Sequence, residues 1–290
     1  MNITLECMPC FVRHTLEVLK EFSDNDALNE RVMRNVLAQM AELDYKISPP
    51  EFAAEIHAFI RNQLDCDDPY LKIKQDSNKL AEKVVKKLEE KLKLSDDPFK
   101  TAVLYAIAGN IIDSGVSAVT PVEEVIKSVE MAEKDPPAID HFEMMREKLS
   151  TANEVLILGD NAGEVFFDRL MLQHFPNGKK FTYAVKSGAI LNDATRSDAH
   201  AADLHNYADL IENGTRFPGT PLSQVSPTFQ SAFSRADLII AKGQANFETL
   251  SHICDNRIFF LLRAKCEVIA GKIGVPKGSF VILCNQEKIV

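Results

Sequence analysis

The chain has no excess of positive charge. Its 33 lysines and arginines stand against 42 aspartates and glutamates, which gives a formal net charge of −9 over 290 residues. This balance argues against nucleic acid or an anionic membrane as the main partner, because both attract basic surfaces. No apolar run approaches the length of a membrane span, and the first residues lack the pattern of a signal peptide. We therefore expect a cytoplasmic protein with no nucleic-acid partner and no membrane partner; its oligomeric state is left open by the sequence.

Several widespread active-site motifs are also missing. There is no Gly-x-Gly-x-x-Gly fingerprint, no Walker A motif, no His-Glu-x-x-His and no nucleophile elbow. Cys7 and Cys10 form one Cys-x-x-Cys pair, but no second such pair completes a zinc site. We expect these two cysteines to anchor the first helix, and Cys266 becomes their neighbour only if the N-terminus packs near the functional site. His200 and His205 are expected at helix surfaces.

The first half of the chain has the pattern of a helical protein. Up to about residue 149 apolar residues recur at helical spacing. Ser48, followed by two prolines and a glutamate, is typical of a helix start, as is Thr120 before Pro121. The Asp-Pro-Pro at residues 135–137 is the best linker candidate. We predict a mainly helical domain over residues 1–149.

The second half has the pattern of an α/β protein. Five short apolar runs alternate with helix-like segments, at residues 155–158, 181–185, 237–241, 258–262 and 280–283. Strands that alternate with helices imply βαβ units and a parallel sheet. We therefore predict an α/β fold in which the helical domain packs on a Rossmann-like α/β/α domain, residues 150–290, with a mostly parallel sheet.

Polar side chains follow four of the apolar runs. In chain order they are Asp160, Asn161, Asn192, Asp193, Lys242, Gln244, Asn246 and Lys265. The carboxyl ends of parallel strands fall on one edge of a sheet, where open α/β sheets bind ligands. We therefore expect these side chains to converge there and to form the functional site of the second domain.

Asp160, Asn161 and Asp193 are candidate metal ligands. Two carboxylates and an amide supply the hard oxygen donors that Mg²⁺ and similar ions prefer, and they leave positions for water and substrate. Taken singly, an Asp-Asn pair after a strand is more often turn chemistry, and Asp193 resembles a helix N-cap. The recurrence of polar clusters at equivalent points of the sheet favours the functional interpretation.

Lys242 and Lys265 are candidate phosphate contacts. A lysine near a divalent cation can neutralise a phosphoryl group, and the helix start near Gly163 would favour a phosphate as well. A lone lysine at a strand end is usually a solvated charge. The combination with the metal ligands predicts a site for metal and phosphate.

These residues belong to motifs that resemble the damage-control phosphatase family, in particular its stand-alone prokaryotic branch with an N-terminal Cys-x-x-Cys. The motifs are Glu6-Cys7-Met8-Pro9-Cys10, Asp68-Pro69-Tyr70, Gly109-Asn110-Ile111-Ile112-Asp113, Leu158-Gly159-Asp160-Asn161-Ala162-Gly163-Glu164, Ile190-Leu191-Asn192-Asp193-Ala194-Thr195, Ala241-Lys242-Gly243-Gln244-Ala245-Asn246-Phe247-Glu248 and Ala264-Lys265-Cys266. Together they cover essentially the whole chain. One departure is Ala245, where the family pattern has glycine; the change removes backbone freedom but no ligand.

The resemblance implies metal-dependent hydrolysis of small phosphate monoesters, with sugar phosphates or damaged phosphometabolites as substrates. By motif, Asp160, Asn161 and Asp193 carry over as ligands of a divalent metal ion (Mn, Co, Ni or Mg), and Lys265 as a phosphate contact. The other matched residues expected at the site are Lys242, Gly163, Glu164, Asn192, Gln244, Asn246 and Glu248.

The mechanism and two rival functions stay open at this point. Water activated by the metal could attack phosphorus in line, or Asp160 could attack directly. Asn110 and Asp113 are expected to reach the cleft between the domains. An S-adenosylmethionine-dependent carboxyl methyltransferase is the first rival, because the family's eukaryotic branch is described as one. Against it, an acid and an amide stand where such a loop usually offers glycines. A nucleotide-binding module is the second rival.

Overall fold

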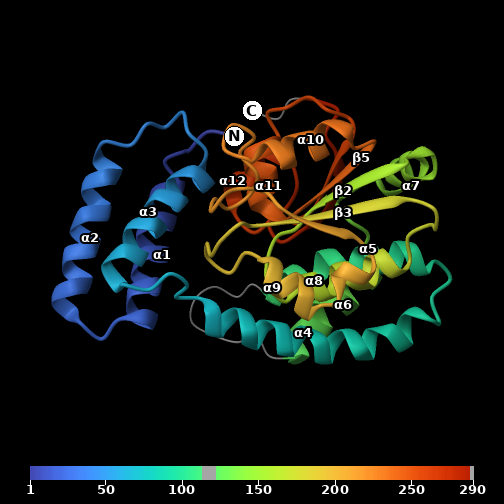
Figure 1. Cartoon of the computed structure of the whole chain (residues 1–290), viewed down its shortest axis with the longest axis horizontal. Helices are drawn as coiled ribbons and strands as arrows, with labels where there is room; N and C mark the ends of the chain where they lie inside the picture. The colour runs from blue at the N-terminus through green and yellow to red at the C-terminus, as the bar shows by residue number, and fades with distance from the viewer. Residues whose placement is uncertain (113–121, 288–290) are drawn as a thin grey trace.

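A seven-stranded sheet forms the centre of the computed structural model, which describes residues 1–112 and 122–287 (Figure 1). The strands are β1 (Ile139–Asp140), β2 (Glu154–Leu158), β3 (Lys180–Val185), β4 (Asp209–Glu212), β5 (Leu238–Lys242), β6 (Ile258–Arg263) and β7 (Phe280–Cys284). Their order across the sheet is β1-β7-β6-β5-β2-β3-β4, and only β6 and β7 pair antiparallel. The predicted α/β class with a mostly parallel sheet is confirmed.

The five predicted strands are apolar along their length because both faces of the sheet are covered. In β2, Val155 and Ile157 enter one hydrophobic cluster, whereas Leu156 and Leu158 enter the cluster on the other face. β1 and β4, the two outermost strands, were not predicted from the sequence. β1 has only two residues, and β4 has no buried residue, so neither carries an apolar run.

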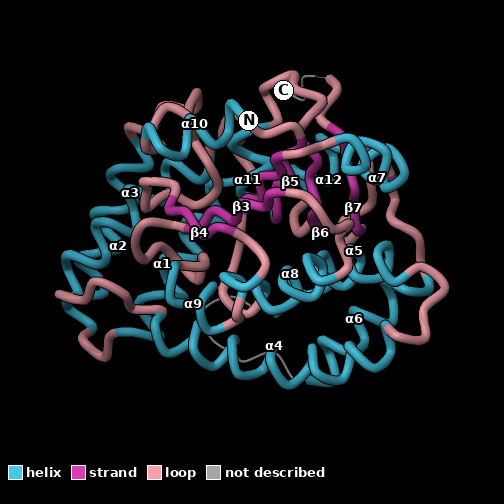
Figure 2. Tube along the Cα trace, turned by 45° about the vertical axis from the view of Figure 1, so that its right-hand side comes forward, coloured by secondary structure: helices cyan, strands magenta, loops and turns pink. Residues whose placement is uncertain are grey.

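Helices cover both faces of the sheet (Figure 2). One face packs against α4 (Leu71–Leu92), α5 (Pro98–Ala108), α6 (Val122–Lys134), α7 (Phe142–Thr151), α8 (Glu164–Gln173) and α9 (Arg196–Ala201). The other packs against α10 (Pro227–Arg235), α11 (Gly243–Leu250) and α12 (Glu267–Ile273). The short 3-10 helices η1 (Gly109–Ile112) and η2 (Leu204–Asn206) follow α5 and α9. The hydrophobic core of the sheet therefore includes α4, α5 and α6, which lie before the predicted boundary at residue 149.

The first three helices form a unit beside the sheet, which we call the helical unit: α1 (Cys7–Phe22), α2 (Asp26–Ala41) and α3 (Pro49–Leu64). Its own core includes Val18, Val36 and Phe52. α3 begins at the predicted place, with a capping box between Ser48 and Glu51. Leu191, from the loop after β3, packs against this core and joins the unit to the sheet.

Some predictions fall on residues that the structure does not describe. The expected cap at Thr120 and Pro121 and the expected cleft residue Asp113 lie outside the described ranges. Among the helices of the described residues, none is both long enough and apolar enough to cross a bilayer.

Leu88→Ala tests whether α4 belongs to the core of the sheet. Leu88 is buried in the same cluster as Ile240 of β5, so truncation leaves a cavity there. The free energy of unfolding should fall by about 2–5 kcal/mol in denaturant titrations, within one cooperative transition. The control Leu94→Ala changes a side chain that is 87% exposed, and it should shift stability by less than about 0.5 kcal/mol. If α4 unfolded in a separate transition at lower denaturant concentration than the sheet, a shared core would be contradicted.

Candidate active site

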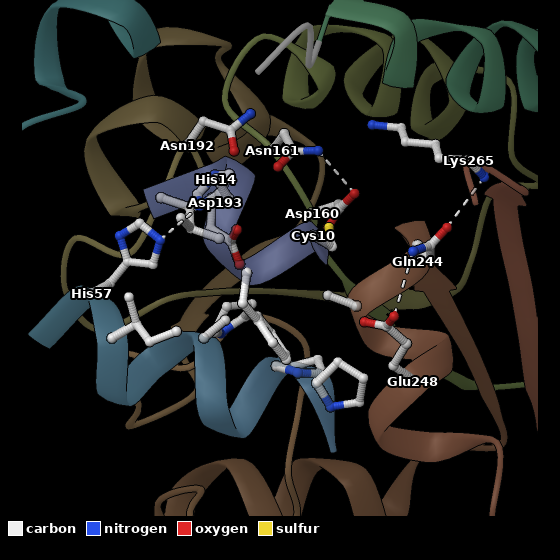
Figure 3. A pocket seen from close by; sticks show the side chains of 18 of the residues that line it. Cys10, His14, His57, Asp160, Asn161, Asn192, Asp193, Gln244, Glu248 and Lys265 are labelled. Carbon is white, nitrogen blue, oxygen red and sulfur yellow. Dashed lines mark hydrogen bonds between the residues drawn. The ribbon is translucent and has the colours of Figure 1, made fainter. Parts of the chain in front are cut away.

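A cavity of about 260 Å³ lies between the strand ends and the helical unit (Figure 3). The residues predicted from the sequence that line it are Asp160, Asn161, Asn192, Asp193, Gln244, Glu248 and Lys265. Side chains of α1 and α3 form the opposite wall. The structure therefore brings together most of the predicted site, including all three candidate metal ligands.

Two loops that are distant in sequence meet at the cavity. Asn161, after β2, and Asp193, after β3, form an isolated antiparallel bridge. The amide of Ala194 donates to the carbonyl of Asp160 at 2.8 Å, and the amide of Ala162 donates to the carbonyl of Asn192 at the same distance. Backbone pairing thus fixes the positions of the candidate ligands relative to one another without a bound metal ion.

The carboxylate of Asp160 is oriented by two amide side chains. Asn161 Nδ2 and Asn110 Nδ2 each donate to Asp160 Oδ2 at 2.9 Å. Asn110 Nδ2 also donates to Glu164 Oε2 at 2.8 Å. Asn110 is therefore a positioning residue that contacts Asp160 from behind; it is buried and is not among the residues that line the cavity.

Gly243 leaves the space that the carboxylate of Asp160 occupies. Its φ of +75° lies in the left-handed region, and a Cβ added there would come within 1.8 Å of Asp160 Oδ2. The carboxylate therefore packs directly on the backbone at the start of α11, where only glycine leaves room. In the sequence, the signal was Lys242-Gly243 at the end of β5, which was noted only as part of a motif.

Lys242 does not line the cavity, contrary to the role expected for it. Its side chain is fully buried, and Nζ donates to Glu164 Oε1 at 2.5 Å, to Asp168 Oδ1 at 2.6 Å and to the carbonyl of Ala106 at 3.0 Å. Burial raises the pKa of Asp168 to about 6 although Lys242 opposes the shift. Burial alone would lower the pKa of Lys242, but the two carboxylates raise it above its usual value. Lys242 therefore acts behind the site, through Glu164 and Asn110.

Lys186 is a cation that the sequence analysis did not select. It follows β3 directly and is buried. Its Nζ lies 3.5 Å from Asp193 Oδ2 and donates to the carbonyl of Gly219. Its position at a strand end was the available signal, but nothing in the sequence distinguished it from a solvated lysine.

Gly163 and Asn246 also lie behind the cavity. The amide of Gly163 donates to Asn78 Oδ1 at 2.7 Å, so the start of α8 is engaged by α4. Asn246 Nδ2 donates to the carbonyls of Lys242 and Gly159, which ties α11 to the end of β2. The helix start that lines the cavity is that of α11, at Gln244 and Ala245. Ala245 lies in ordinary helical backbone, so glycine is not required there.

Gln244 organises the far end of the cavity. Its Oε1 accepts from the amide of Lys265 at 3.2 Å, and its Nε2 donates to Glu248 Oε1 at 3.4 Å and to Cys266 Sγ at 3.7 Å. Burial raises the pKa of Glu248 to about 7, although the N-terminal ammonium and Gln244 oppose the shift. Glu248 is therefore partly protonated near neutral pH.

The N-terminal cysteines do pack near the site. Cys10 is exposed on the lining of the cavity, where partial desolvation, followed by the proximity of Cys266 and Cys7, raises the pKa of its thiol. Burial also raises the pKa of Cys266. All six cysteines of the chain are free. At neutral pH Cys10 and Cys266 are therefore thiols rather than thiolates, which suits packing better than nucleophilic attack.

The donor set fits a hard divalent cation. Among the residues that the structure describes, no group of three His, Cys, Asp or Glu side chains could hold a metal ion. The candidate set instead combines the carboxylates of Asp160 and Asp193 with the carboxamide of Asn161, each at most 6% exposed and all lining one cavity. Such a set of oxygen donors leaves coordination positions for water and phosphate.

Comparison with protein families identifies the chain. Residues 3–281 match the model of the damage-control phosphatase ARMT1-like domain. The chain belongs to this family. The damage-control phosphatase of Pyrococcus horikoshii is 36% identical over the whole of both chains, and that of Archaeoglobus fulgidus is 35% identical over 97% of this chain and 98% of its own.

A solved structure agrees with this assignment. The crystal structure of a DUF89 family protein from Pyrococcus horikoshii superposes with a TM-score of 0.91 at 35% identity, covering 98% of this chain and 99% of that chain. Membership of the family supports a phosphatase role for this damage-control phosphatase homologue.

Gly243→Ala should weaken the binding of a divalent metal ion at Asp160. The added methyl group would displace the carboxylate of Asp160 and strain the backbone. Titration calorimetry with Mn²⁺ should show affinity lowered by at least about tenfold. The matched control is Gly271→Ala, whose Cβ would meet nothing within 4 Å. Equal metal affinity in both variants would contradict the role given to Gly243.

Glu248→Gln should change how stability depends on pH. The pKa of Glu248 rises from 4.5 to about 7 on folding, so the folded state holds the proton more tightly. The free energy of unfolding should therefore fall between about pH 4.5 and pH 7 by on the order of 3 kcal/mol from this group. In denaturant titrations Glu248→Gln should match the wild type near pH 5 and exceed it at pH 8. For the control Glu21→Gln, at an exposed position, the free energy of unfolding should depend on pH as it does in the wild type. If Glu248→Gln showed the wild-type pH dependence as well, the raised pKa of Glu248 would be refuted.

Proposed function

We propose that the protein is a metal-dependent hydrolase of small phosphate monoesters, such as sugar phosphates or damaged phosphometabolites, that acts in the cytoplasm. The observation that carries the proposal is the convergence of Asp160, Asn161 and Asp193 on one cavity that Lys265 also lines. Oxygen donors for a metal and a cation for a phosphoryl group thus face the same space.

Asp160, Asn161 and Asp193 would hold the metal ion, for which Mn, Co, Ni and Mg are the candidates. When bound, a divalent ion polarises a phosphoryl oxygen and lowers the pKa of water. The chain's own residues supply the rest. Lys265 neutralises charge on the phosphoryl oxygens. The start of α11, at Gln244 and Ala245, also lines the cavity, and a helix N-terminus favours an anion.

Neighbouring side chains fix the orientation of Asp160. Asn110 and Asn161 hold Asp160 in one orientation, so its carboxylate needs no rearrangement during the reaction. The same rigidity suits either role of Asp160, as a ligand or as the group that attacks phosphorus.

The cavity favours small substrates. Its volume of about 260 Å³ lies below the roughly 300–1,000 Å³ of pockets for drug-sized ligands. A phosphorylated sugar or a similar metabolite suits this volume better than a phosphoprotein or a nucleotide cofactor. The site and its size therefore support the same substrate class.

Asp160→Ala tests the proposal. Metal-dependent release of phosphate from p-nitrophenyl phosphate should fall by at least about 100-fold, because the variant loses both a metal ligand and a preorganised charge. Asp24→Ala, at an exposed position, should keep full activity, and a chelator should silence the wild type. Undiminished turnover by Asp160→Ala, or calorimetric binding of S-adenosylmethionine without any binding of Mn²⁺, would overturn the assignment.

A further inference from the structure

Glu248 carries a carboxyl group that lines the cavity and has no role yet in the proposed reaction. It stands on α11, one turn after Gln244, and borders the same space as Asp160 and Lys265. Gln244 Nε2 donates to Glu248 Oε1 at 3.4 Å, and Gln244 Oε1 accepts from the amide of Lys265 at 3.2 Å. Figure 3 shows the carboxyl group of Glu248 pointing away from α11, toward Gln244 and the cavity. The side chain of Gln244 therefore joins Glu248 to the segment that holds the candidate phosphate contact.

The surroundings of Glu248 keep it partly protonated near neutral pH. Apart from the residues just named, the titratable groups on the elements around it are the ammonium group of Met1, the thiols of Cys10 and Cys266, His14 and His57 of the opposite wall and, along a second cavity of about 470 Å³ that Glu248 also borders, Lys46, Glu51 and His252. Burial has the largest effect and raises the pKa of Glu248 to about 7, against the ammonium group and Gln244. The two thiols add no charge at this pH, because their own pKa values are raised. An acid with a pKa near the working pH is well matched to proton transfer.

Hydrolysis of an alkyl phosphate calls for such a proton donor. When the bond between phosphorus and the ester oxygen breaks, the electron pair goes to that oxygen, and an alkoxide is a strong base that leaves slowly unless it is protonated. Among the described residues that line the cavity, Glu248 is the carboxyl group that remains once Asp160 and Asp193 are assigned to the metal. Burial lowers the pKa of His57 well below its usual value, so His57 is a neutral imidazole and a poor acid.

We propose that Glu248 is the general acid of the reaction and donates its proton to the ester oxygen of the departing alcohol. The inference rests on the proposed phosphatase function and deepens it, because it adds the group that alkyl esters such as sugar phosphates require. Glu248 is then a catalytic residue, since it touches a reacting atom. Gln244 is a positioning residue that acts through the carboxyl group of Glu248.

Bonds and protons balance over one turnover. The oxygen of a water molecule forms the new bond to phosphorus, the bond from phosphorus to the ester oxygen breaks, and the proton of Glu248 moves to that oxygen, which departs in an alcohol. The carboxylate of Glu248 then recovers a proton from the water that was added to phosphorus, directly or through solvent. If Asp160 attacks first, the same donation accompanies that step, and the water that cleaves the aspartyl phosphate returns the proton.

Two esters that differ in the basicity of the leaving group test the proposal. Propyl phosphate releases a strongly basic alkoxide and has no hydroxyl group that Glu248 could bind instead, whereas p-nitrophenyl phosphate releases a weakly basic phenolate. Glu248→Gln keeps the size of the side chain but lacks the acidic proton. For propyl phosphate, kcat should fall by at least about 100-fold. For p-nitrophenyl phosphate the fall should be at least about tenfold smaller, because the phenolate leaves without a proton.

The pH profile gives a second readout. Because the acid must hold its proton, kcat/KM of the wild type for propyl phosphate should fall as the pH rises above about 7. This alkaline limb should be absent in Glu248→Gln, and ionisation of the ester cannot explain the difference, since both proteins receive the same substrate. Glu248→Asp keeps an acidic proton and should retain the limb. Titration calorimetry should give equal Mn²⁺ affinities for Glu248→Gln and the wild type, because Glu248 is not a candidate ligand.

Glu21→Gln, at an exposed position, is the matched control and should leave both esters and the pH profile unaffected. Thermal unfolding separates loss of fold from loss of catalysis, and Glu248→Asp keeps the test decisive if Glu248→Gln folds poorly. Equal losses on both esters, no loss on either, or an alkaline limb that persists in Glu248→Gln would overturn the role of Glu248 while leaving the phosphatase intact. So would a wild type that hydrolyses only the aryl ester, or a selective loss of propyl phosphate hydrolysis in His14→Gln rather than in Glu248→Gln. A wild type that hydrolyses neither ester with any of the four metals would overturn the proposed function itself.

Discussion

The buried ammonium group of Lys242 is the interaction on which the geometry of the site depends. A charge without water costs several kcal/mol unless it is paired and hydrogen-bonded. Here Glu164 and Asp168 of α8 and the carbonyl of Ala106 in α5 surround it. All three partners are in place only when α5 and α8 are both packed on β5. Because Asn110 then links Glu164 to Asp160, the orientation of the candidate ligand is coupled to the packing of the whole layer.

Asp193, the other candidate carboxylate ligand, is positioned by a different constraint. Leu191, two residues before Asp193, has a φ of +48°, which is unfavourable for a side chain with a Cβ. Its side chain packs against the core of the helical unit, and the next two residues line the cavity. Packing of that unit therefore offsets the backbone strain that turns Asn192 and Asp193 toward the site. The helical unit thus contributes to the candidate metal site without supplying a candidate ligand.

The sequence predicted what depends on local pattern and chain topology. The strands β2, β3, β5, β6 and β7 were predicted because burial on both faces makes them apolar, whereas β4, which has no buried residue, was not. The convergence of Asp160 with Asp193 followed from a parallel sheet. Lys242 and Lys265 look alike in sequence, since each lies at or after the end of a strand. Lys242 is buried because it forms ion pairs with Glu164 and Asp168 of α8, which lie far from it in the chain. Lys265 instead lines the cavity. Long-range pairing of this kind leaves no periodic signal.

His14, which lines the cavity from α1, illustrates the same limit from the other side. Its place in the first helix was predictable, but which face of α1 meets the sheet depends on how the helical unit docks. The segments that hold Asp160, from α5 to β5, and those that shape the opposite wall, α1 and α3, are separate in the chain. Charge stabilisation at phosphorus demands fixed groups, whereas recognition of an organic group requires only complementary shape and hydrogen bonding. The two sides of the cavity therefore meet different requirements: fixed groups around Asp160, and complementary shape and hydrogen bonding along α1 and α3.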